Sequence, residues 1–71
     1  MVNTDKLRGR MAEKRISGVD MAGYLGISPK GFYEKMKHGR FGLDDASVMI
    51  EVLDISDVND IADIFFSKKV S

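Results

Sequence analysis

The residue types that most often carry catalysis are scarce in this chain of 71 residues. It contains no cysteine and one histidine, His38, and no carboxylate stands next to that histidine. A lone histidine at the end of a helix is usually a surface residue that suits the helix dipole. The segment 39–42 (GRFG) follows a predicted helix, whereas a phosphate-binding glycine loop follows a strand. We therefore expect no enzyme, no catalytic residue and no small-molecule substrate.

Four aspartates recur at every third position, which raises the question of calcium binding: Asp54, Asp57, Asp60 and Asp63. An EF-hand loop places its first ligands at every second position, needs glycine at its sixth position and ends with glutamate. Neither Asp54 nor Asp57 starts such a series. We therefore expect no metal site and no cofactor, and we interpret these residues as helix caps and solvated acids that could meet a cationic partner.

Polar side chains between residues 30 and 40 are candidates for contact with DNA. Lys30, Lys37 and Arg40, with the cations of the first predicted helix, could bind phosphates. Lys30 and Tyr33 could reach base edges. Glu34 lies on the same face, where a carboxylate is tolerated only opposite a cytosine amino group. These five residues form the candidate DNA-binding site.

The net charge is zero, but its two signs are unevenly distributed along the chain. Residues 1–40 hold nine Lys/Arg against four Asp/Glu, and residues 41–71 hold two Lys against seven Asp/Glu. The halves therefore carry +5 and −5. This division predicts a dipolar molecule whose positive side faces phosphate and whose negative side faces a basic protein. The alternative is two solvated surfaces that happen to differ.

The elements that must position these residues begin with a predicted helix-turn-helix at residues 18–37. Ala22 falls where two helices would cross closely, and Gly26 falls at the turn, where a positive φ is needed. Apolar residues occupy the positions at which the two helices would pack on each other: Met21, Leu25, Ile27, Phe32 and Met36. Such a unit presents its second helix to a major groove. An ordinary pair of core helices is the alternative.

The whole chain is predicted to form one all-α domain, residues 1–71, with five helices. Their expected ranges are about 3–15, 18–25, 29–38, 43–53 and 57–66, and residues 67–71 are expected to be a disordered tail. Ser17 and Ser28 are predicted N-caps, with Pro29 at the first position of the third helix. The expected buried stripes of the last two helices are Leu43, Ala46, Ile50 and Leu53, and Val58, Ile61, Ala62 and Phe65.

The chain has no apolar run of 18 residues and no signal-peptide pattern. We therefore expect no membrane association and a cytoplasmic location.

The chain resembles the Cro/CI-type helix-turn-helix regulators of temperate phages along nearly its whole length. The resemblance rests on the order of helices, on Ala22 and Gly26, and on the runs 32–41 (FYEKMKHGRF) and 43–46 (LDDA). The ending 64–71 (IFFSKKVS) is similar to the modulator-of-repression antirepressors of phages of Gram-positive hosts. The resemblance implies a lambda repressor-like fold, a bacterial cytoplasm and a part in the choice between lysis and lysogeny.

Two positions depart from the family pattern for operator reading. Family members typically carry a polar residue at the first position of both helices of the motif, where this chain has Gly18 and Pro29. We therefore favour an antirepressor that binds a phage CI-type repressor and masks its DNA-binding domain. Its candidate partner-binding residues are acidic, with an apolar anchor at the end: Asp44, Asp45, Glu51, Asp54, Asp57, Asp60, Asp63, Ile64 and Phe66.

Three alternatives stay open. The first is a Cro-like repressor that binds operator DNA directly, alone or together with the repressor. In the second, Phe66 closes the protein's own core or makes a homodimer contact. The third, a structural or toxin-like protein, has no supporting feature beyond small size.

Overall fold

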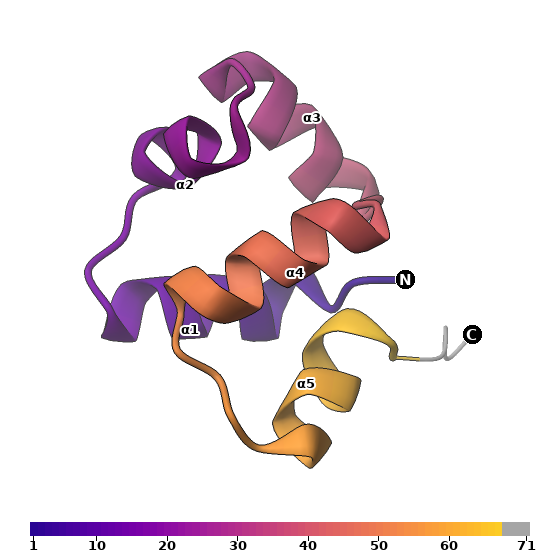
Figure 1. The fold of residues 1–71 in the computed structure, drawn as a ribbon. Helices are drawn as coiled ribbons and strands as arrows, with labels where there is room; N and C mark the ends of the chain where they lie inside the picture. Colours follow the sequence, from indigo (N-terminus) through magenta and orange to yellow (C-terminus); the bar gives the residue numbers. More distant parts are fainter. Residues whose placement is uncertain (68–71) are drawn as a thin grey trace.

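The computed structural model of the protein describes residues 1–67, and within that range the chain forms five helices and no strand. The helices are α1 (Thr4–Glu13), α2 (Gly18–Leu25), α3 (Pro29–His38), α4 (Leu43–Val52) and α5 (Val58–Phe65), arranged as Figure 1 shows. The predicted all-α class is confirmed. The ranges of α2 and α3 are as predicted, whereas α1 and α4 end earlier than predicted and α5 is one residue shorter at each end.

Short polar side chains fix where α2 and α3 begin. The Ser17 hydroxyl accepts a hydrogen bond from the Asp20 N–H at 3.0 Å, and the Asp20 carboxylate accepts one from the Ser17 N–H at 3.1 Å. Ser28 accepts from the Gly31 N–H at 3.0 Å, and Pro29 is the first residue of α3. Each cap satisfies backbone donors that have no partner inside the helix and contributes about 1 kcal/mol.

Four residues with positive φ lie at the ends of helices or shortly after them. Gly26 (φ 72°) and Gly39 (φ 62°) end α2 and α3. Arg15 (φ 56°) and Asp54 (φ 54°) adopt the same backbone region shortly after α1 and α4, although neither is a glycine. Left-handed backbone costs an L-residue about 1–2 kcal/mol, so these two sites are strained while the glycines are not.

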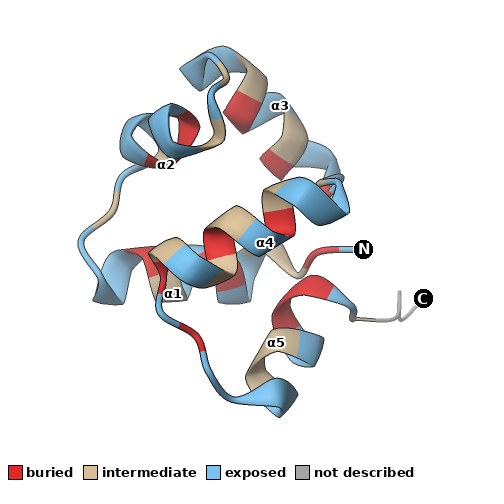
Figure 2. Cartoon of the chain, viewed as in Figure 1, coloured by how far each residue is buried: buried red, intermediate tan, exposed pale blue. Residues whose placement is uncertain are grey.

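The core forms where α2 packs against both α3 and α4, and where α5 packs against α1 (Figures 1 and 2). Five side chains are almost fully enclosed in it: Leu7, Met21, Phe32, Met49 and Leu53. The Cα radius of gyration is 11.1 Å, close to the roughly 11 Å expected of a compact chain of this length.

The buried stripes of α4 and α5 differ from those predicted. Leu43 is 72 % exposed and Val58 is 77 % exposed, and Ala62 is also on the surface. Met49 and Ile64 take places in the core instead. Ala46, Leu53 and Phe65 are buried as predicted.

The first three residues join elements that are distant in sequence. The Val2 N–H donates to the Gly39 carbonyl oxygen (3.1 Å), and the Asn3 N–H donates to the Ile64 carbonyl oxygen (2.7 Å). The Ser67 hydroxyl donates to the Met1 carbonyl oxygen at 3.0 Å. These hydrogen bonds therefore connect the N-terminal segment to the end of α3 and to the end of α5. Ser67, predicted to lie in a disordered tail, is part of this contact, while the rest of that predicted tail, 68–71, lies outside the described residues.

None of the helices in residues 1–67 combines the length and the apolar character that crossing a membrane requires.

Candidate functional site

The outer side of α3 carries the candidate DNA-binding residues. Lys30, Tyr33, Glu34 and Lys37 are exposed on this helix, and Arg40 is exposed just after Gly39 ends it. Among residues 1–67, no acidic side chain forms an ion pair with Lys30, Lys37 or Arg40. These three cations therefore remain available to an anionic partner.

Tyr33 lies against the start of α2. A Cβ built on Gly18 would stand 2.7–2.8 Å from atoms of the Tyr33 ring, so the phenol occupies space that any larger residue at position 18 would need. The ring also packs edge-on against Phe32, with centroids 5.7 Å apart, and remains 54 % exposed. The Tyr33 ring of α3 thus fills the space that a side chain at Gly18 would occupy. This contact was not predicted from the sequence.

Beside this contact, α1 and α3 border an open groove of about 290 Å³ whose floor is apolar. Met11, Phe32 and Met36 line the groove from the core, and Arg8 lies at its α1 side. Arg8 is paired with Asp5 at 3.3 Å on the exposed surface of α1.

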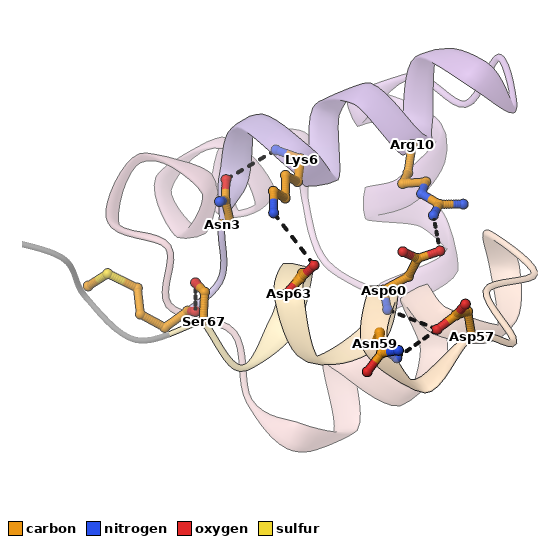
Figure 3. Close-up of polar contacts among 9 residues, drawn as sticks. Asn3, Lys6, Arg10, Asp57, Asn59, Asp60, Asp63 and Ser67 are labelled. Carbon is orange, nitrogen blue, oxygen red and sulfur yellow. Dashed lines mark hydrogen bonds and ion pairs between the residues drawn. The ribbon is translucent and has the colours of Figure 1, made fainter.

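Four of the seven candidate partner-binding acids have internal roles. Asp60 binds Arg10 at 2.5 Å and Asp63 lies 3.8 Å from Lys6, so α5 is connected to α1 by two ion pairs (Figure 3). Asp57 caps α5 by accepting from the Asn59 N–H at 2.7 Å. Asp45 lies 3.5 Å from Lys35 and accepts from the Gly42 N–H at 3.3 Å. These acids stabilise the fold, which reduces their availability to a partner.

The pairing of α1 with α5 also involves cations that the sequence assigned to phosphate contact. Lys6 and Arg10 stand four residues apart on α1, and Asp60 and Asp63 stand three apart on α5. Both spacings place a pair of like charges on one side of a helix. Matching these two stripes could have predicted the contact from sequence.

The other three acids lie on α4 and just after it. Asp44 and Glu51 stand seven residues apart on α4, with exposed Ser47 between them, and this spacing places both on one side of the helix. Asp54 follows the C-cap Leu53 with a φ of 54°, so it lies beyond the helix. We call these three residues the α4 acidic group. None of the three forms an ion pair within the part of the chain that the structure describes.

The two apolar candidates have different environments. Phe66 is 53 % exposed and is accessible to a partner. Ile64 is only 2 % exposed and belongs to the core, so its assignment to the partner-binding surface is corrected. The amphipathic pattern of α5 allowed both positions, but the packing of α5 on α1 turns Ile64 inward.

The predicted separation of charge is present in part. Residues 41–67 contain seven acids and no Lys or Arg, so that half of the described chain is strongly acidic. Three ion pairs nevertheless join it to the basic half, through Lys6, Arg10 and Lys35. The charges that form no ion pair within residues 1–67 include the three cations on and just after α3 and the α4 acidic group. No group of three or more metal-ligating side chains is assembled within residues 1–67.

Comparisons of the chain with protein families, with curated proteins and with solved structures found no match.

Proposed function

We propose that the protein is a transcription regulator of a temperate-phage switch and acts as an antirepressor. In this proposal α2 and α3 form a helix-turn-helix of the Cro/CI type, and the protein binds a CI-type repressor and covers its DNA-binding domain. The observation that carries the proposal is the α4 acidic group, Asp44, Glu51 and Asp54, none of which forms an ion pair within residues 1–67. Gly18 and Pro29 support it, because neither provides a side-chain hydrogen bond to DNA.

The physical basis is competition between two anions for one cationic surface. A repressor that binds an operator must present Lys and Arg to phosphates, and these contacts supply much of its affinity. Asp44 and Glu51 are about 10 Å apart along α4, at 1.5 Å per helical residue, and Asp54 follows the end of the helix. The α4 acidic group can therefore place several carboxylates against such a surface at once. Phe66, half exposed near the end of α5, is available as an apolar anchor of the kind that dominates interfaces.

The proposal expects a CI-type repressor gene beside the gene for this chain, and its test is binding to that repressor, measured by calorimetry. The double variant Glu51→Lys/Asp54→Lys should weaken the complex about tenfold or more, because it replaces two attractive charges with repulsive ones. Asp5→Lys/Glu13→Lys is the matched control, since it makes the same change of net charge on α1 and should have a smaller effect. The proposal fails if no complex forms, and the assignment to α4 fails if both double variants weaken it equally.

A second candidate function is direct operator binding, favoured by the exposed and unpaired Lys30, Lys37 and Arg40. In that case the purified protein alone should shift operator DNA at nanomolar concentration in about 150 mM salt. Lys30→Ala and Lys37→Ala should each weaken the shift and lower the slope of log affinity against log salt by about 1. An antirepressor without DNA affinity shows no such shift, and both variants bind the repressor like the parent protein.

A further inference from the structure

The second helix is apolar on more than its core-facing side. Its sequence, GVDMAGYL, contains a single charged residue, Asp20. Met21 and Ala22 face the core and are at most 1 % exposed, whereas Val19 and Tyr24 are 58 % and 60 % exposed. Figure 2 shows much of α2 as exposed surface. A helix that is apolar around most of its circumference is expected to be covered on more than one side.

The exposed side of α2 forms one wall of an open groove of about 630 Å³, the larger of the two grooves described here. The groove is lined by Arg15, Ile16, Val19, Asp20, Gly23 and Tyr24. A Cβ placed on Gly23 would meet nothing within 4 Å, so the helix backbone is openly accessible at this point. An exposed glycine inside a helix destabilises it, but it permits close approach of another backbone.

The groove carries one charge of each sign. Within residues 1–67 Arg15 forms no ion pair. Asp20 also forms none there, and one of its carboxylate oxygens accepts from the Ser17 N–H in the capping box. The second oxygen is available to a cation from outside. A surface with an apolar centre and one charge of each sign is complementary to itself when it is rotated by two-fold symmetry.

We propose that this groove is the interface of a homodimer, in which α2 of one copy packs against α2 of a second copy. The two-fold axis passes through the groove, so that each copy's Arg15 approaches the other's Asp20 and the exposed Val19 and Tyr24 side chains become buried. A second copy is the occupant that fits best, because the charges of the groove cancel and the whole chain has zero net charge. Two copies therefore do not repel each other at long range.

The dimer is expected to be weak and dependent on concentration. The six lining residues are far fewer than the roughly 20–30 per side in a standard stable interface. Sedimentation equilibrium should therefore show the mean mass rising from monomer toward dimer between about 10 μM and 1 mM.

Glycine variants distinguish an effect on dimerisation from an effect on helix stability. Gly23→Ala should raise the thermal midpoint by about 5 °C, because alanine favours the helix, and should weaken the dimer about tenfold by blocking close approach. Gly9→Ala is the matched control, since Gly9 also lies exposed in a helix with nothing within 4 Å of its Cβ position. It should raise the midpoint similarly and leave self-association unchanged.

A charge exchange tests the pairing across the axis. Arg15→Asp and Asp20→Arg should each lose dimerisation about tenfold, because like charges then face each other. An equal mixture of the two variants should regain it, since every facing pair in the mixed dimer has opposite signs. Recovery in the mixture also shows that both variants are folded.

The proposal is overturned if the protein stays monomeric at about 1 mM, a concentration at which even a weak interface associates. It is equally overturned if a dimer forms but Gly23→Ala weakens it no more than Gly9→Ala, because the interface then lies elsewhere. Failure of the mixed variants to associate, when both are folded by circular dichroism, rejects the two-fold pairing of Arg15 with Asp20.

Discussion

Gly26 and Gly39 have nearly the same backbone geometry but different surroundings, which separates two reasons for requiring glycine. Both adopt positive φ at the end of a helix. A Cβ on Gly26 would meet nothing within 4 Å, whereas a Cβ on Gly39 would lie 2.9 Å from the Val2 carbonyl oxygen. Gly39 also accepts the Val2 N–H in a backbone hydrogen bond. A side chain at either position would be strained by the positive φ, and only at position 39 would it also be crowded.

We expect Gly26→Ala to lower the free energy of unfolding by about 1 kcal/mol, the cost of left-handed backbone. Gly39→Ala should lower it by about 2–3 kcal/mol, because the new methyl group also displaces the N-terminal segment. Urea unfolding followed by circular dichroism measures both losses. Equal losses would show that the contact with Val2 contributes nothing to stability.

Single residues with strong local chemistry were the most predictable features of the chain. The Ser17 and Ser28 caps and the glycine at position 39 gave the limits of α2 and α3 because each acts within one helical turn. Arg15 and Asp54 were not predicted to be left-handed. Arginine rarely adopts that conformation, and aspartate is enriched in it but adopts it too seldom to mark a position. The contact of Tyr33 with Gly18 was also missed, because it joins two helices and has no local signature.

At the scale of the helices, periodicity predicted where α4 and α5 lie and only part of the side that each helix buries. In α5, both Val58 and Ile64 fit an apolar stripe that includes Ile61 and Phe65. Packing on α1 selects Ile64, which is 2 % exposed, and leaves Val58 at 77 %. The apolar periodicity of α5 contains no information about that neighbour, so periodicity alone could not make the choice.

The attachment of α5 to α1 should depend on salt. Asp60→Asn should reduce the free energy of unfolding by about 0.5 kcal/mol at low ionic strength, and Asp63→Asn by less, since both pairs are partly exposed and screened by solvent. The Arg10–Asp60 pair is the shorter and less exposed of the two. Urea unfolding in about 0.05 M and 1 M NaCl provides the comparison, because 1 M salt reduces the Debye length to about 3 Å.

Both losses should disappear in the high-salt series. A loss that persists there would mean that Asp60 stabilises α5 by packing or hydrogen bonding rather than by charge. The Asp5→Asn variant serves as a reference, because its pair with Arg8 lies within α1 and does not connect two helices.

For the whole molecule, the division of charge between the two halves was recognised in the sequence, but its partial neutralisation across the fold was not predicted. Asp45, Asp60 and Asp63 meet cations that lie 10 to 57 residues away along the chain. Counting charges by segment therefore overstated the acidic surface. The candidate site that remains is smaller than predicted: the α4 acidic group of three residues, opposed in sign to the cations of α3.

These remaining charges are exposed, so they should act mainly on how fast a charged partner is encountered. Exposed charges steer diffusion and change association rates more than dissociation rates. For the proposed complex with a CI-type repressor, Glu51→Lys/Asp54→Lys should slow association about tenfold in low salt and change dissociation much less. Asp5→Lys/Glu13→Lys changes the net charge equally and should slow association to a smaller degree. Biolayer interferometry at a series of salt concentrations measures both rates, and the association rates of all forms should converge as screening increases. If the α4 variant instead accelerates dissociation and leaves association unchanged, its acids are buried in the complex rather than steering its formation.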